Sequence, residues 1–136
     1  MSKATIRSTE LILVVLTLSG CGLSGPAHGP PLSNAAATVD MGFESYSPAT
    51  VTIRRGQTVE WRNTSLITHT VTDDPKLAKR SDDAVLPAGA AAFDSGDIPG
   101  GQIYTQTFDV PGTYRYFCTR HEGGGMVATV IVRPAP

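Results

Sequence analysis

From about Ala37 onward, short runs of apolar and β-branched residues alternate with polar residues and are separated by turn-forming segments. Alternation with a period of two is typical of strands that bury one face, whereas a helix needs a longer run with a period near 3.6. We expect strands at 38–41, 49–53, 57–62, 68–72, 91–95, 103–108, 112–118 and 126–132. Strands this short and evenly spaced, with Pro-Gly turns between them, predict an all-β fold, a two-sheet Greek-key β-sandwich.

The chain has 136 residues, enough for one domain with a single hydrophobic core. We assign this domain to residues 37–136. Eleven lysine and arginine residues stand against 12 aspartate and glutamate residues, so the formal net charge is −1. A chain near neutrality lacks the broad positive field of a nucleic-acid binder, and we therefore expect no nucleic-acid partner.

The start of the chain has the layout of an export signal. A cationic segment precedes an apolar run over 11–18, which is shorter than the roughly 20 residues of a membrane-spanning helix. We therefore interpret residues 1–20 as a signal peptide. The run Leu-Ser-Gly-Cys at 18–21 resembles the lipobox of bacterial lipoproteins, which predicts that Cys21 is lipidated. The alternative is an ordinary signal peptide followed by an incidental cysteine.

Residues 21–36 are rich in glycine, proline and serine and show no periodicity, which is the composition of a flexible tether. Lipidated at Cys21, this tether would anchor the domain to a membrane, facing the periplasm or the cell exterior. His28 lies in the tether, and we interpret it as a solvated residue because no second metal donor stands nearby.

One segment between the expected strands is too polar for a core strand. Residues 73–83 carry a pair of aspartates at each end, with three basic residues between them. Charge runs of this kind are usually solvated, so we predict a surface loop that holds at most one short helix.

Three metal-binding side chains of different softness follow the seventh expected strand. Cys118, His121 and Met126 offer a thiolate, an imidazole and a thioether within nine positions. The chain must reverse between them, and the three glycines 123–125 permit a sharp, left-handed backbone. We take His69 as a fourth donor, because sandwiches cluster functional residues in the loops at one end. Two imidazoles, a thiolate and a weak axial thioether are the ligands of a blue-copper electron-transfer centre.

Three other interpretations of these side chains remain. Zinc competes with copper because cysteine and histidine both suit it, although a thioether such as Met126 adds little to a zinc site. The donors could also be an inert buried cysteine and unrelated neighbours, but their joint occurrence at ligand spacing argues against this. A disulfide between Cys21 and Cys118 is disfavoured, because it would join the lipid-attachment point to the ligand end of the sandwich.

These segments are similar to those of the plastocyanin-like cupredoxins, over most of residues 37–136. The most specific match is Cys-x-x-His-x-x-x-x-Met at 118–126, and an asparagine followed after five residues by a histidine, at 63–69, supports it. The resemblance implies one type 1 copper ion per chain, with His69, Cys118, His121 and Met126 as its ligands.

The resemblance also implies roles for two residues next to these ligands. Asn63 corresponds to an asparagine that ties the first ligand loop to the last. Thr70 stands where the family often has asparagine directly after the first histidine ligand, and its hydroxyl could link the two loops.

The function that follows is that of a membrane-tethered, extracytoplasmic protein that shuttles single electrons through Cu(II) and Cu(I). Its partners would be redox proteins such as a cytochrome or a copper or haem oxidase or reductase, bound transiently by a monomer. We do not expect an enzyme, because three histidines are too few for the further copper sites of a multicopper oxidase or nitrite reductase. The alternative is a protein that stores or delivers copper outside the cytoplasm.

The resemblance places the route for electrons at the His121 edge. We expect Leu66, Ile67 and the glycine run to form an apolar rim there. Arg120 and Glu122 are expected to flank the edge with opposite charges. Docking at such a surface should be short-lived and only mildly sensitive to salt.

Overall fold

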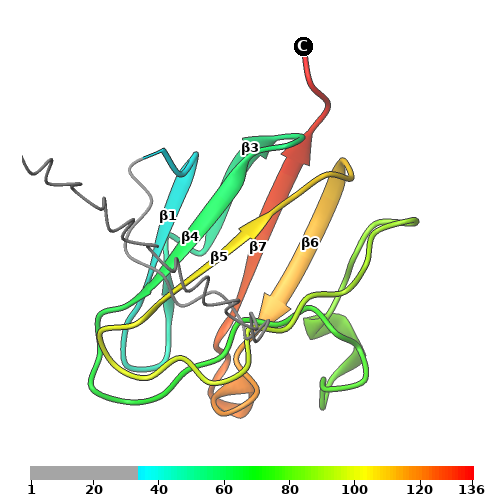
Figure 1. Cartoon of the computed structure of the whole chain (residues 1–136). Helices are drawn as coiled ribbons and strands as arrows, with labels where there is room; N and C mark the ends of the chain where they lie inside the picture. The colour runs from blue at the N-terminus through cyan, green and yellow to red at the C-terminus, as the bar shows by residue number, and fades with distance from the viewer. Residues whose placement is uncertain (1–33) are drawn as a thin grey trace, which may run out of the picture.

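Seven strands form in residues 34–136, the part of the chain that this computed structural model describes (Figure 1). They are β1 (Ala37–Met41), β2 (Tyr46–Ser47), β3 (Thr50–Arg54), β4 (Thr58–Asn63), β5 (Ile103–Thr107), β6 (Gly112–Phe117) and β7 (Val127–Arg133). Two short 3-10 helices, η1 (Ser81–Asp83) and η2 (Glu122–Gly124), lie between strands. Within the described residues no helix is long and apolar enough to cross a bilayer. The predicted signal peptide, Cys21 and His28 lie outside these residues.

The strands pair into two sheets, with the orders β2-β1-β4-β5 and β3-β7-β6. Both sheets are mixed, because β1 runs parallel to β4 and β3 runs parallel to β7, while the remaining pairs are antiparallel. The predicted all-β, two-sheet sandwich is confirmed. The turn at 55–57 carries the chain from β3 in one sheet to β4 in the other, and Gly56 adopts a left-handed φ of 84° in this turn.

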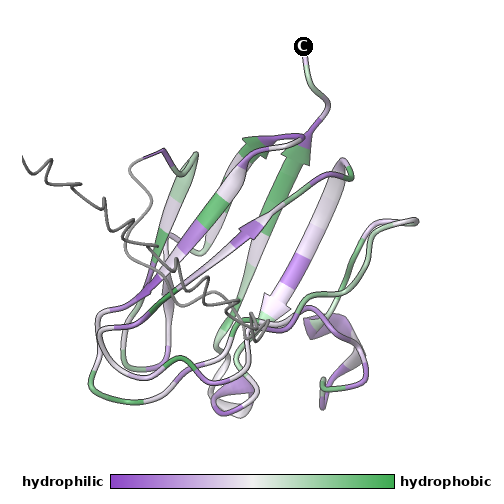
Figure 2. Ribbon diagram, viewed as in Figure 1, coloured by the Kyte–Doolittle hydropathy of each residue, from purple (hydrophilic) through white to green (hydrophobic). Residues whose placement is uncertain are grey.

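The core lies between the two sheets and follows from the period-two pattern. Buried and more exposed residues alternate along β3 and β7, so each strand presents one apolar face to the opposite sheet. Figure 2 shows β7 as hydrophobic along most of its length and the loop with η1 as mostly hydrophilic. Trp61 lies at the centre of an aromatic cluster, with four ring centroids 5.4 to 6.4 Å from its own, those of Phe93, Tyr104, Phe108 and Tyr116.

Two expected strands, 68–72 and 91–95, are wrong as strands. These segments make only isolated bridges, among them Thr72 to Asp94 and Thr72 to Phe117. Side chains replace the missing strand partner: the Val71 amide donates to Ser95 Oγ at 2.8 Å, for example. Once side chains satisfy these backbone donors, a continuous ladder is not needed.

The segment 73–83 forms the predicted loop with one short helix, but its ends are not solvated. Asp73 and Asp83 are 0% and 4% exposed. Asp73 Oδ1 accepts a hydrogen bond from the Phe93 amide at 2.8 Å, and the Asp83 carboxylate lies 3.6 Å from the Arg115 guanidinium. The loop is therefore fastened to the sandwich by its acidic ends, while the basic residues between them face solvent.

Candidate metal centre

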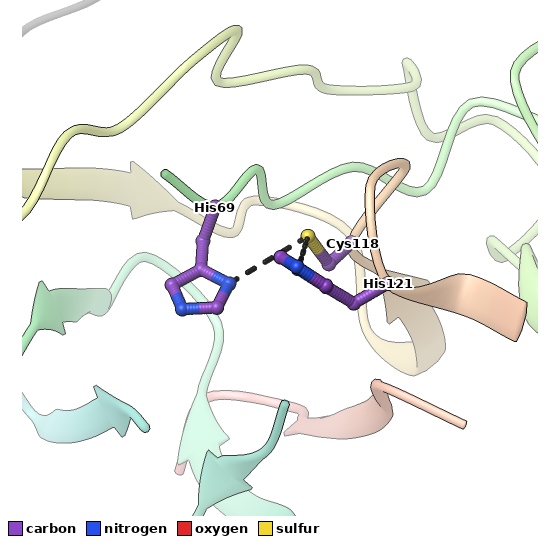
Figure 3. Close-up of side chains that lie close together, drawn as sticks. All are labelled: His69, Cys118 and His121. Carbon is purple, nitrogen blue, oxygen red and sulfur yellow. Dashed lines mark hydrogen bonds between the residues drawn. The ribbon is translucent and has the colours of Figure 1, made fainter. Parts of the chain in front are cut away.

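Three side chains meet at the end of the sandwich opposite the C-terminus (Figures 1 and 3). Cys118 Sγ lies 3.8 Å from His69 Nδ1 and 3.4 Å from His121 Nδ1, and one ligand atom from each of the three lies within 4.8 Å of the others. His69 and Cys118 are completely buried, whereas His121 is partly exposed. The cluster therefore has a closed side within the protein and an open side at His121.

The reversal between β6 and β7 holds three of the four predicted ligands. The last strand pair joins Phe117 to Val127, and Cys118 follows directly on β6. The Cys118 amide donates to Met126 O at 3.1 Å, and the Met126 amide donates to His121 O at 3.2 Å. These bonds close the loop and bury Met126 completely at its base.

The glycine run in this loop works differently from the prediction. Only Gly125 is left-handed, with a φ of 85°, whereas Gly123 and Gly124 belong to η2. One left-handed residue is enough because the 3-10 turn already reverses much of the chain. A Cβ on Gly124 would lie 2.8 Å from Glu44 Oε2, the end of an exposed side chain that can move aside, so space does not require a glycine there.

His69 reaches the cluster from the loop between β4 and β5. Its backbone forms a bridge with Ile98, with N–O distances of 3.1 and 2.7 Å. Its Nε2 lies 3.0 Å from Ser65 Oγ, so the ring is held from behind while Nδ1 faces Cys118. With Nε2 as the donor in this bond, Nδ1 keeps a lone pair for a metal ion.

Asn63 supports the same loop. The resemblance implied that Asn63 ties this loop to the last ligand loop, but its hydrogen bonds all stay on the side of the first ligand loop. Its Oδ1 accepts hydrogen bonds from the Ser65 amide and hydroxyl at 3.0 and 2.7 Å. Its Nδ2 donates to Ile67 O and Ile98 O, both at 2.7 Å. Asn63 therefore fixes Ser65, which in turn contacts His69. Ser65 was not predicted from the sequence; the signal was that a ligand histidine needs a hydrogen-bond partner at its second ring nitrogen.

Thr70 makes the link between the two ligand loops. Its Oγ1 accepts a hydrogen bond from the Thr119 amide at 2.8 Å and lies 3.1 Å from the Thr119 hydroxyl. Its own amide donates to Cys118 Sγ at 3.4 Å. The Thr70 hydroxyl thus links the two ligand loops, as expected for the position where the family often has asparagine.

The surroundings of His69 favour the neutral form of its imidazole. Burial lowers the pKa of His69, and the neighbouring His121 lowers it further. A hydrogen bond with the Gly42 backbone raises this pKa but does not outweigh the other two effects. His69 is therefore neutral near pH 7, as a metal ligand must be. Among residues 34–136, Cys118 forms no disulfide.

The donor set fits one soft metal ion. Two ligands bound to the same ion at about 2.0 to 2.3 Å lie roughly 3 to 4 Å apart, which matches the two sulfur–nitrogen separations. Two imidazoles and a thiolate with a buried thioether nearby suit copper. The arrangement is thus chemically suited to hold copper away from bulk water.

An open hollow of about 620 Å³ lies on the surface beside His121. It is lined by Phe43, Leu66, Ile67, Thr68, Arg120 and His121. Leu66 is 100% and Phe43 is 72% exposed, which is unusual for large apolar side chains. Leu66, Ile67 and Arg120 line the hollow, as expected for this edge, and Phe43 is an addition that was not predicted. The glycine run does not line the hollow.

The charges expected beside His121 are only partly there. Arg120 is exposed and forms an ion pair with Asp97 through Nε and Nη2. Glu122 does not flank the edge, because it is 3% exposed and its carboxylate accepts hydrogen bonds from the Lys79 and Arg80 amides at 2.9 to 3.0 Å. Glu122 therefore fastens the ligand loop to the loop at 73–83.

Comparisons with known proteins agree with this geometry. The family model "Copper binding proteins, plastocyanin/azurin family" matches residues 33–133. The chain is 35% identical to a chloroplastic plastocyanin of Tetradesmus obliquus, over 97% of this chain and 90% of the relative. It is 33% identical to a plastocyanin of Synechococcus sp. (strain JA-2-3B'a(2-13)), over 93% of each. A solved Cu(I) form of an amicyanin variant superposes with a TM-score of 0.62 at 27% identity, covering 80% of this chain and 92% of the variant.

Proposed function

The chain belongs to the plastocyanin/azurin family of copper-binding proteins, with one type 1 copper ion as its cofactor, and on this premise we propose that it is a one-electron carrier. The observation that carries the proposal is the buried thiol between two imidazoles; in the part of the chain that the structure describes, His121 is the one of these three side chains that reaches the surface. Copper bound there supplies a Cu(II)/Cu(I) couple that takes up and releases one electron.

We assign His69, Cys118 and His121 as the main ligands and Met126 as the weak axial ligand. The closeness of the first three donor atoms supports this assignment, as does the backbone bonding of Met126 to both Cys118 and His121. Because Met126 is a thioether in apolar surroundings, it favours Cu(I) more than an amide or carbonyl oxygen would.

The chain around the ligands is suited to electron transfer because it resists rearrangement. Ser65 holds the His69 ring, and Thr70 bonds both Cys118 and the next ligand loop. Ligand positions fixed by such bonds change little between oxidation states, so the barrier to transfer from reorganisation stays low.

Electrons then pass through the partly exposed edge of His121, which lines the hollow. Leu66 and Phe43 give a partner an apolar contact surface, and the Arg120–Asp97 pair adds opposite charges at its rim. A small surface of this kind suits transient docking of another redox protein, with little dependence on salt.

We further propose that the domain works outside the cytoplasm, tethered to a membrane by a lipid on Cys21. The support is the export-signal layout of residues 1–20 and the lipobox resemblance at 18–21. Expression of the full chain with Cys21→Ser should move the protein from the membrane fraction to the soluble exported fraction. Unchanged partitioning would contradict lipidation.

Electron self-exchange tests the carrier function without the natural partner. Mixed Cu(I) and Cu(II) protein should exchange electrons fast enough to broaden nuclear magnetic resonance lines, and copper should stay bound when a Cu(I) chelator is added. A storage or delivery protein would instead release Cu(I) readily to the chelator and show no line broadening.

A further inference from the structure

One buried tyrosine contacts the copper site from outside the ligand loops. Tyr46 lies in β2, at the edge of the four-stranded sheet, and is 4% exposed. Its hydroxyl donates a hydrogen bond of 2.6 Å to Thr70 O. Its ring packs edge-on against Tyr116 with centroids 4.8 Å apart. Phenylalanine would fill the same space, so the hydroxyl's particular contribution is its bond to Thr70.

Thr70 is the residue whose backbone bonds the sulfur ligand. Its amide donates to Cys118 Sγ at 3.4 Å. This N–H belongs to the peptide group between His69 and Thr70. The carbonyl oxygen of the same group, His69 O, accepts a hydrogen bond from Ile98 N at 2.7 Å. The peptide group after it carries the carbonyl that Tyr46 binds, and Val71 N in the same group donates to Ser95 Oγ at 2.8 Å. Tyr46 therefore completes the set of bonds that sets the direction of the Thr70 N–H.

The state of the phenol fits a donor role. Burial raises the pKa of Tyr46 well above its usual range, and the nearby Cys118 and Tyr116 raise it further. The hydroxyl is therefore protonated and donates throughout the physiological pH range. A buried hydroxyl is costly unless it is bonded, so this contact with Thr70 O is maintained.

We propose that Tyr46 is a positioning residue for the copper thiolate, acting through the Thr70 backbone to hold the Thr70 N–H against Cys118 Sγ. The proposal rests on the function proposed above, because it requires copper bound to that sulfur. An N–H bond withdraws charge from the thiolate, which weakens its donation to Cu(II) and so favours Cu(I). Loss of the Tyr46 hydroxyl should therefore lower the reduction potential.

The test compares two tyrosine-to-phenylalanine variants of the full copper-loaded chain. Tyr46→Phe removes the bond to Thr70. Tyr114→Phe removes a similar bond, from Tyr114 to Val110 O at 2.8 Å, near the end of β6 that lies away from Cys118. We expect Tyr46→Phe to shift the Cu(I)/Cu(II) ratio at a fixed potential by at least about threefold. This equals roughly 28 mV, since a tenfold change is 59 mV for one electron.

The readouts separate this role from a merely structural one. Tyr46→Phe should move both the potential and the sulfur-to-copper absorption band, whereas Tyr114→Phe should change stability and leave both in place. Equal potentials in the two variants would overturn the proposal. A wild-type protein that binds copper without becoming blue would instead overturn the proposed function.

A measurement on the wild type covers the case in which Tyr46→Phe does not fold. In the Cu(I) protein, the Tyr46 hydroxyl proton and the Thr70 amide proton should both exchange slowly with solvent and show mutual proximity by nuclear magnetic resonance. Rapid exchange of the Tyr46 hydroxyl would contradict its bond to Thr70 and overturn the proposal.

Discussion

The carboxylate of Glu122 is predicted to be the main fastening between the ligand loop and the loop at 73–83. It accepts three hydrogen bonds from two backbone amides, those of Lys79 and Arg80, and is almost completely buried. Glu122→Ala leaves both amides without their acceptor. Each amide that loses its acceptor costs about 1 to 2 kcal/mol, and not more, because water can reach this exposed loop. The free energy of unfolding should therefore fall by about 2 to 4 kcal/mol.

Glu122→Gln tests how much of this depends on charge. A glutamine Oε1 can still accept from both amides, but its NH₂ group then faces the Lys79 amide, donor against donor. Bonds to a neutral acceptor are also weaker, so we expect a smaller loss of about 1 to 2 kcal/mol. Asp82→Asn is the matched control, since it removes one negative charge at an exposed position of the loop at 73–83, to which Glu122 is bonded.

Urea unfolding of the copper-free protein measures these differences, and trypsin cleavage after Lys79 and Arg80 reports release of the loop. Cleavage should be fastest in Glu122→Ala and unchanged in Asp82→Asn. If the free energies of unfolding of both Glu122 variants lie within about 0.5 kcal/mol of the wild-type value, the usual range for a surface substitution, Glu122 does not fasten the two loops.

Three further predictions concern a buried acid, the surface hollow and the axial ligand. Burial raises the pKa of Asp73 from 3.8 to about 6. Between these two pH values the native state binds more protons than the unfolded state, so the free energy of unfolding falls as the pH rises from about 4 to above 6. Asp73→Asn should remove that fall. In urea titrations the variant should be up to about 3 kcal/mol more stable than the wild type at pH 7.5 and no more stable at pH 4. Parallel stability–pH profiles of the two proteins would contradict this. Leu66→Glu should leave the potential and stability unchanged, because Leu66 is fully exposed, yet slow electron self-exchange at least about tenfold; an unchanged rate would remove the hollow from the electron route. Met126→Gln should keep copper and lower the reduction potential in a spectroelectrochemical titration, and a constant potential would show that Met126 is not an axial ligand.

Local patterns were sufficient for most of the fold. The period-two alternation in β3 and β7 predicts strands because each buries one face, and this holds for any partner strand. The spacing from Cys118 to Met126 was likewise informative, since a reversal between two paired strands brings both ends of the segment together. Such signals depend only on residues close in sequence.

Features that depend on distant partners were predicted less well. Segment 68–72 shows strand-like alternation, but Ser95 and Cys118 supply the partners for its amides, and neither can be matched to it by periodicity. Glu122 was expected at the surface because it is charged, and it is buried because the loop at 73–83 folds over it. Phe43 belongs to no recognisable pattern, and it lines the same hollow as Leu66 only in the folded chain.

The most direct test of the copper centre is the electron paramagnetic resonance spectrum of the Cu(II)-loaded chain, recorded with its visible absorption. A thiolate between two imidazoles, shielded from water, predicts a narrow copper hyperfine splitting and an intense blue sulfur-to-copper band, both lost in Cys118→Ser. A colourless copper-loaded protein with a wide hyperfine splitting, or a blue colour that survives Cys118→Ser, would contradict the account.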